Sequence, residues 1–185
     1  LWDRARERLL LARDHMGQKP LFFSNVSGAF TFASEVKGLL ASKLIEPQME
    51  LEGLWHYMSL RFMPDGFTFF KDIHKLPAGS RLVFKNQTVK VDRYWDIDFL
   101  KKHPGSEREI EEGPHQTLRK TVESHMLSDV PVGAFLSGGI DSGTVSAMMA
   151  TLQDQPVPVF SIGVKEQSFN ELPYARMVAE RYGME

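Results

Sequence analysis

The chain has 185 residues, of which 42% are hydrophobic and 25% charged, and its net charge is −2. This balance is typical of a globular protein and gives no overall attraction to nucleic acid or to an anionic membrane. No apolar run approaches the roughly 20 residues that span a bilayer, and residues 1–8 do not resemble a signal peptide, so a cytoplasmic location is expected. Because the chain has no cysteine, it offers no disulfide, thiolate metal site or cysteine nucleophile.

The first half of the chain predicts short strands joined by turns. Three pairs of apolar runs predict three β-hairpins: 1–3 with 8–12, 20–24 with 29–33, and 80–84 with 89–94. Helical spacing predicts one helix from Val36 to Leu40, with Ser34 as its N-cap, and a second helix over 50–60.

Two features of this half have structural interpretations. Arg13 and Asp14 precede Gly17, and we expect a buried ion pair between them that fixes a turn, in preference to a catalytic role. An apolar stripe on the second helix is expected to pack in the core; it consists of Leu51, Leu54, Trp55 and Met58.

The composition changes between residues 96 and 113, where a Lys-Lys-His-Pro-Gly-Ser segment precedes a run of glutamates. This change predicts a solvated linker over 96–113 that separates one domain, 1–95, from another, 114–185.

Beyond the linker, apolar runs alternate with helical patterns. The runs 132–136 and 156–164 predict strands, the first of them buried on both faces, and 172–182 predicts a helix. Strand, helix, strand and helix in this order indicate a parallel sheet, so the fold class is α/β overall.

A glycine-containing loop follows the first of these strands, and it is the strongest functional signal in the chain. The loop runs Ser137-Gly138-Gly139-Ile140-Asp141-Ser142 and leads into a helix. Two glycines let the backbone turn sharply and bring N–H groups close to a ligand. Asp141 or Ser142 can cap the helix, whose unpaired N–H groups favour an anion. The pattern therefore predicts a phosphate site.

The loop differs from the two common phosphate-binding motifs, since the chain contains neither GxxxxGK[ST] nor GxGxxG. With no lysine in the loop, the counter-charge to a triphosphate must come from N–H groups, Mg²⁺ and other residues. Asp141 is the predicted Mg²⁺ ligand, because hard cations combine carboxylate and phosphate oxygens. The structural alternative is a glycine-rich turn in which Asp141 is only a cap.

A second segment is expected to meet this loop, because ligands of parallel sheets lie beyond the carboxyl ends of the strands. Residues 162–163 end the next strand, so Phe135, Leu136 and Ile162 can face a nucleotide base, or they can be strand core alone. Asn170 and Glu171 precede the last helix, where capping is the expected role and a substrate role for Glu171 is the alternative.

Several of these motifs carry a resemblance to a known family. The segment 128–142, SDVPVGAFLSGGIDS, resembles the pyrophosphate-binding loop of glutamine-dependent asparagine synthetases. The similarity continues through FSIG at 160–163 and FNELPYA at 169–175, and upstream through ARDHMGQKPLFF at 12–23 and FASEVK at 32–37. One departure is Gly143, where the family usually has a second serine.

The resemblance implies that the chain is an internal fragment of such an enzyme. Residues 1–95 would be the C-terminal portion of an N-terminal-nucleophile-type α+β glutamine amidotransferase (type 2) domain. Residues 114–185 would begin a parallel-sheet ATP pyrophosphatase domain of the PP-loop, adenine nucleotide alpha hydrolase-like kind. The glutaminase cysteine would lie upstream of Leu1, so no glutaminase catalytic residue is assigned, and the fragment alone is expected to be inactive.

The resemblance also implies substrates and site residues. The substrates would be aspartate, glutamine and ATP, with Mg²⁺ as cofactor and β-aspartyl-AMP as intermediate. ATP and pyrophosphate would contact the loop, the metal would bind Asp141, and the adenine would face Phe135, Leu136 and Ile162. The loop residues concerned are Ser137, Gly138, Gly139, Asp141 and Ser142.

Two other interpretations share every motif quoted. One is a related carboxylate-activating amidotransferase, β-lactam synthetase-like or polysaccharide-modifying. The other is a truncated assembly module without turnover. The sequence leaves open whether the chain forms a homodimer.

Overall fold

The computed structural model describes residues 1–26, 28–102, 104–166, 168 and 170–185. Residue 27 between the predicted strands 20–24 and 29–33, residue 103 of the predicted linker and part of the 169–175 motif fall outside the described residues. The chain divides into two compact units, Leu1–Lys101 and Lys102–Glu185. No helix within the described ranges has the length and apolar character needed to cross a membrane.

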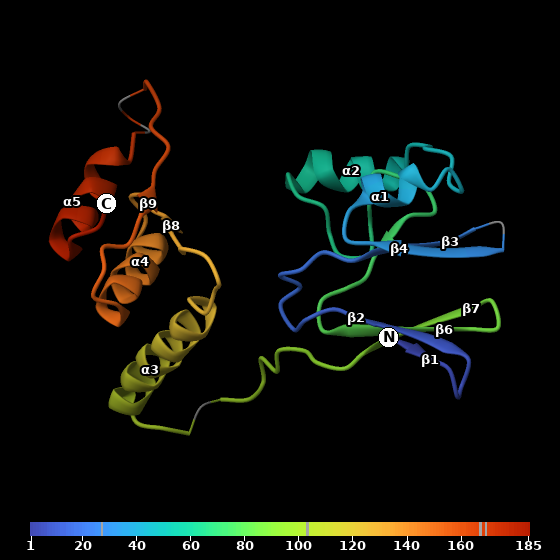
Figure 1. Ribbon diagram of the computed structural model, residues 1–185, viewed down its shortest axis with the longest axis horizontal. Coiled ribbons are helices and arrows are strands. Elements are labelled where there is room, and N and C mark those ends of the chain that lie inside the picture. The colour runs from blue at the N-terminus through green and yellow to red at the C-terminus, as the bar shows by residue number, and fades with distance from the viewer. Residues whose placement is uncertain (27, 103, 167, 169) are drawn as a thin grey trace. The chain divides into compact units, whose positions relative to one another are not determined.

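The first unit contains two antiparallel sheets (Figure 1). One has the order β1-β2-β6-β7 and the other the order β4-β3-β5. The strands of the first sheet are β1 Trp2–Asp3, β2 Arg8–Ala12, β6 Ser80–Lys85 and β7 Thr88–Arg93. Those of the second are β3 Phe22–Val26, β4 Ala29–Ala33 and β5 His74–Lys75.

All three predicted hairpins are confirmed, with small shifts in their ends. Their registers pair Trp2 with Leu9, Phe23 with Phe32, and Leu82 with Val91. The β6–β7 turn uses Asn86 and Gln87 at φ of 48° and 61°, the left-handed conformation that two-residue hairpin turns require.

Neighbouring side chains along a strand point to opposite faces of the sheet and so contribute to two separate hydrophobic cores in the first unit. Phe23 of β3 packs with Leu11 and Leu82 of the other sheet, so this core joins the two sheets. The neighbouring Phe22 points to the opposite face and packs on a core with Leu39 of α1, Val36–Ala41. The result is a layered arrangement of sheet, sheet and helix, as Figure 1 shows.

Both predicted helices of this unit form, but their details differ from the prediction. The N-cap of α1 is Glu35 and not Ser34, and Glu35 makes no side-chain cap bond within the described chain.

The apolar stripe of α2, Leu51–Leu60, is not core. Leu51, Trp55 and Met58 are 71%, 71% and 73% exposed. The helix packs instead through its opposite face, at Gly53, where an added Cβ would overlap the carbonyl oxygen of Thr68. The spacing of apolar residues located the apolar face of α2 correctly. However, Gly53 decides which face of the helix packs against the rest of the unit.

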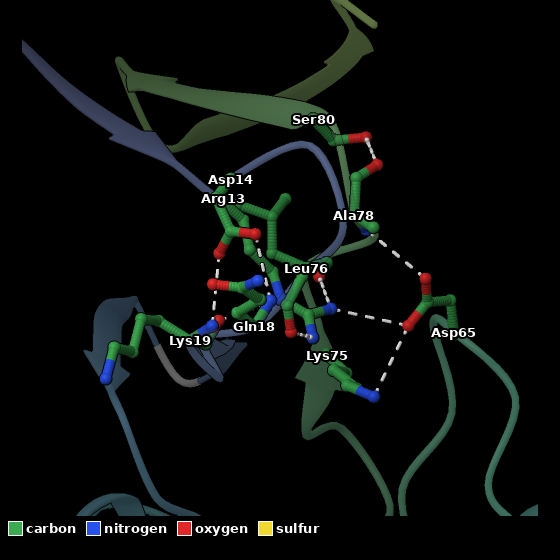
Figure 2. A network of polar contacts seen from close by, with 10 residues as sticks. Arg13, Asp14, Gln18, Lys19, Asp65, Lys75, Leu76, Ala78 and Ser80 are labelled. Atoms are coloured by element: carbon green, nitrogen blue, oxygen red, sulfur yellow. Dashed lines mark hydrogen bonds and ion pairs between the residues drawn. The ribbon is translucent and has the colours of Figure 1, made fainter. Parts of the chain in front are cut away.

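Arg13 is buried, as predicted, but its partner is not Asp14. Its guanidinium donates to the carbonyl oxygens of Gly17, Lys19 and Leu76 at 2.6, 3.0 and 2.7 Å. It also lies 3.3 Å from a carboxylate oxygen of Asp65. Figure 2 shows how this one side chain ties the 13–19 loop to the segments around 65 and 76.

Asp14 fixes the same turn in a different way. Its carboxylate accepts from the backbone N–H groups of Gln18 and Lys19 at 2.9 and 3.1 Å (Figure 2). The N–H groups of Lys19 and Gln18 hold the pKa of Asp14 below its ordinary value. The predicted turn-fixing role is therefore confirmed for both residues, while the predicted ion pair between them is wrong.

Among its described residues, the second unit has a two-stranded parallel sheet and three helices. Its strands are β8 Ala134–Phe135 and β9 Val159–Phe160. Its helices are α3 Glu107–His125, α4 Ile140–Leu152 and α5 Leu172–Tyr182. The core joins Val122 of α3 to Met148 and Met149 of α4 and to Val157.

The parallel pairing and the helix at 172–182 are confirmed, but both strands are shorter than predicted. The first is not buried on both faces, since Phe135 is 83% exposed while Leu136 is 2% exposed. A strand gains burial on its second face only when another element covers it, and the short sheet leaves that face open.

The buried guanidinium of Arg13 leads to a first prediction. Arg13→Lys should lower the free energy of unfolding by about 2–3 kcal/mol, because an ammonium cannot satisfy three separated carbonyl oxygens. Arg81→Lys is the matched control, since Arg81 has a half-exposed side chain and one long ion pair, 3.9 Å from Asp92. It should change stability by less than about 0.5 kcal/mol. Urea unfolding followed by circular dichroism checks this, and equal effects of the two variants would contradict it.

Asp65 gives a pH-dependent prediction. Partial burial raises the pKa of Asp65, but the hydrogen bond from the Ala78 N–H and the charges of Lys75 and Arg13 outweigh it and leave the pKa lowered. The ionised form therefore stabilises the fold above about pH 4, the ordinary carboxylate value. That stabilisation is lost as the pH falls through the lowered pKa.

Asp65→Asn should thus reduce stability by about 1 kcal/mol at pH 7 and make it less sensitive to acid. Glu46→Gln, at an exposed carboxylate of the same unit, should leave the acid sensitivity unchanged. Urea midpoints between pH 7 and pH 3 measure both effects. An unchanged slope in Asp65→Asn would rule out this origin of the pH dependence.

Candidate functional site

The candidate site is the turn between β8 and α4. The helix begins at Ile140, and its N-cap is Gly139 at φ −79° and ψ 153°, with no side-chain cap bond among the described residues. Asp141 and Ser142 therefore lie in the first helical turn, and the prediction that one of them caps the helix is wrong. The N–H groups of this first turn have no intrahelical acceptor and point out of the helix end.

Two serine hydroxyls organise the loop from inside. The Oγ atoms of Ser137 and Ser142 lie 2.7 Å apart. The Ser137 N–H donates to the Ser142 Oγ at 3.1 Å, and the Gly139 N–H donates to the Ser137 Oγ at 3.2 Å. These hydrogen bonds between polar groups of the loop hold it in one shape, although the loop lies at the surface.

Gly138 is needed for close packing against α5. A Cβ at this position would lie 2.8 Å from the Cβ of Glu171 and 3.0 Å from that of Tyr174. Neither Gly138 nor Gly139 has a positive φ, so the sharp turn does not explain the glycines. The Gly138 N–H donates to Oε2 of Glu171 at 3.1 Å.

One cavity brings the two predicted segments together. A pocket of about 420 Å³ is lined by Ser137 and Ser142 of the loop and by the three predicted base-contacting residues, Phe135, Leu136 and Ile162. Phe135 and Ile162 are exposed, whereas Leu136 is 2% exposed and its N–H already donates to the Phe160 carbonyl oxygen at 2.9 Å.

The other predicted site residues, Gly138, Gly139 and Asp141, are not part of the lining of this pocket. Gly138 and Gly139 line a neighbouring groove of about 400 Å³ between α4 and α5. Asp141 is exposed on the first turn of α4. Whether these residues bind a nucleotide stays a prediction.

Sequence reasoning missed two polar contacts of the pocket. The Ser161 hydroxyl donates to the Leu136 carbonyl oxygen at 2.6 Å and so joins the two strand ends. Glu171 was expected to cap its own helix, yet its carboxylate reaches Gly138, and the Asn170 side chain accepts from the Leu172 N–H instead. The position of Ser161 directly after a strand was a usable signal, whereas the reach of Glu171 depends on tertiary packing.

The donor set suits a metal that is held mainly by phosphate. Within the described residues, no group of three or more His, Cys, Asp or Glu side chains gathers to hold an ion. Mg²⁺ is commonly bound through one or two carboxylates together with phosphate oxygens and water. The exposed carboxylate of Asp141, in the first turn of α4, fits that pattern.

The two units together define a class of protein. An antiparallel α+β unit comes first in the chain, and a parallel α/β unit follows it. In the second unit, the turn from strand to helix opens on a pocket. Family models match the chain in the same order. The model described as a glutamine amidotransferase domain matches residues 1–95, and that described as asparagine synthase matches residues 115–185. The chain therefore belongs to the glutamine-hydrolysing asparagine synthetase family.

Individual relatives agree with this membership. A putative glutamine-hydrolysing asparagine synthetase 2 of Methanocaldococcus jannaschii is 34% identical over 98% of this chain and 36% of its own length. Glutamine-hydrolysing asparagine synthetase 1 of Bacillus subtilis is 30% identical over 100% of the chain and 29% of its own length. An amidase of Penicillium rubens is 36% identical over 84% of the chain and 23% of its own length. The chain thus spans about a third or less of these relatives.

The two glycines 138 and 143 offer a matched pair of substitutions. Gly138→Ala should destabilise the second unit by about 1–3 kcal/mol, because its Cβ would displace the start of α5. Gly143→Ala should stabilise it by up to about 1 kcal/mol, since Gly143 is helical and its Cβ would lie 3.7 Å from Val178, an ordinary contact. Urea unfolding followed by circular dichroism measures both, and the same sign for both would contradict the packing described.

Proposed function

We propose that the chain is part of an ATP-dependent amidotransferase that makes asparagine from aspartate and glutamine-derived ammonia. In this proposal, residues 1–95 are the later part of the glutaminase domain. The 96–113 segment is the linker, which runs into α3 from Glu107 onward, and 114–185 begin the ATP pyrophosphatase domain. The reaction proceeds through β-aspartyl-AMP and releases pyrophosphate.

The observation that carries the proposal is the pocket at the end of the parallel strands. It combines Ser142 of the first turn of α4, the Ser137 hydroxyl and strand-end residues in one place. A helix N-terminus favours anions, and the crevice beyond the carboxyl ends of parallel strands is where ligands of such sheets bind. ATP needs both a phosphate site and a base site.

The chemistry explains why ATP is required. A carboxylate has no leaving group that ammonia can displace. A β-carboxylate oxygen of aspartate attacks the α-phosphorus of ATP, and the bond from that phosphorus to the bridging oxygen breaks as pyrophosphate leaves. Ammonia then attacks the activated carbonyl carbon, AMP departs with the C–O electron pair, and a proton from nitrogen is lost to solvent.

The loop contributes by stabilising the charge that builds on the departing pyrophosphate. The N–H groups of Gly138 and Gly139 and the hydroxyls of Ser137 and Ser142 are donors whose positions are fixed by hydrogen bonds within the loop and to Glu171. These bonds exchange for phosphate oxygens when the nucleotide binds. Preorganised donors of this kind often lower an activation barrier more than any other single effect. Asp141 would hold Mg²⁺, which when bound neutralises phosphate charge.

The base would lie at the other end of the pocket. Phe135 and Ile162 offer exposed apolar surface to an adenine ring, and Leu136 offers its backbone. Ser161 holds the Leu136 carbonyl in place.

A second candidate is a related enzyme that acts on another carboxyl or amide substrate. It is favoured by the amidase of Penicillium rubens, which is 36% identical to the chain, a value similar to that of the synthetases. Pyrophosphate release by the full-length protein with aspartate and with other carboxylic acids separates the two candidates.

Asp141 supplies the test of the proposed site. Asp141→Asn should lower the rate of ATP-dependent pyrophosphate release by the full-length protein about 10²-fold or more, because the carboxylate ligand of the metal is lost. Asp154→Asn, at an exposed aspartate beyond the other end of α4, should retain the rate within about twofold. An Asp141→Asn variant as active as the control would refute the assigned role.

A further inference from the structure

Glu171 uses its carboxylate in an unusual way for the residue at the start of a helix. It occupies the N-cap position of α5 but makes no side-chain cap bond to that helix among the described residues. Its Oε2 instead accepts from the N–H of Gly138, a residue 33 positions earlier in the chain, at 3.1 Å. Glu171 also lines the pocket that contains Ser137 and Ser142.

The bonded N–H belongs to the group of donors that the proposed function gives to pyrophosphate. A carboxylate and a phosphate oxygen are both anionic acceptors. They cannot share one N–H without repulsion, and in a partly exposed pocket of low polarity that repulsion is only partly screened. Binding of the phosphate at Gly138 therefore requires the carboxylate to move away.

The backbone at this contact is held by hydrogen bonds, whereas the Glu171 side chain is exposed. The main chain of Glu171 lies against Gly138, with its carbonyl oxygen 3.0 Å from the position of an added Cβ. Its carbonyl also accepts from the N–H groups of Tyr174 and Ala175 at the start of α5. The carboxylate is exposed, so a change of side-chain rotamer can release the N–H without unfolding α5.

We propose that Glu171 is an internal anion that occupies the Gly138 N–H until the pyrophosphate group of a nucleotide replaces it. The inference rests on the proposed function and adds a positioning residue to it. Glu171 keeps the empty loop in its binding shape, and its displacement lowers the affinity for the phosphates. Weaker retention of pyrophosphate favours release of this product.

The test compares Glu171→Gln with the wild type, both in the full-length protein. Glutamine keeps an oxygen that accepts from the Gly138 N–H, so the fold is retained while the negative charge is removed. Glu166→Gln removes the same charge from an exposed residue in the loop before α5 and serves as the matched control. Isothermal titration calorimetry with pyrophosphate, and separately with ATP, in the presence of Mg²⁺ gives the affinities.

We expect Glu171→Gln to bind pyrophosphate about five- to tenfold more tightly than wild type, which at tenfold corresponds to about 1.4 kcal/mol. The control should stay within about twofold. The difference should shrink as salt rises to about 1 M, because added ions screen the repulsion. A purely structural role would not produce this salt dependence.

The outcomes separate the inference from the proposed function. Equal or weaker binding by Glu171→Gln, with normal binding by wild type, would overturn the inference and leave the proposed function standing. If neither form bound ATP or pyrophosphate, the proposed function would fall and the inference with it. Circular dichroism confirms that each variant is folded.

Discussion

The candidate site depends on one steric constraint, the absence of a side chain at Gly138. Because nothing projects from this position, the first turn of α5 can lie against the loop that precedes α4. That approach places the Glu171 carboxylate beside Gly138. It also lets the ends of β8 and β9 and the starts of α4 and α5 surround one pocket. In the first unit, Arg13 has a comparable role, since one buried guanidinium connects three loop carbonyls. In both units, a single position fixes segments far apart in the sequence.

Sequence reasoning predicted the local elements well because they depend on local patterns. Pairs of apolar runs separated by turns predicted the three hairpins, and helical spacing of apolar residues predicted α1, α2 and α5. The order of strands and helices predicted the parallel pairing of β8 with β9. Family membership followed from the 128–142 segment and its companions, and the matches over residues 1–95 and 115–185 agree with it.

What the sequence did not show was which partner each residue meets. Trp55 and Met58 form a regular apolar stripe, but Gly53 on the opposite face decides the packing of α2. Arg13 is adjacent to Asp14, yet its ion pair is with Asp65, 52 residues away. At the candidate site, the Ser137–Ser142 motif predicted where the loop lies but not the hydrogen bonds within it. The cap at Gly139 and the reach of Glu171 both depend on tertiary contacts that no short window of sequence contains.

The placement of the tryptophans has a practical consequence for spectroscopy. All three tryptophans of the chain, Trp2, Trp55 and Trp95, lie in the first unit. Trp55 is open to solvent, whereas Trp95 stacks on the ring of His15 with 4.7 Å between centroids. Tryptophan fluorescence of this chain therefore reports on the glutamine amidotransferase portion alone, because the asparagine synthase portion contains no tryptophan. A tryptophan introduced at Phe160, which lines the pocket, would give the second portion a fluorescence signal of its own.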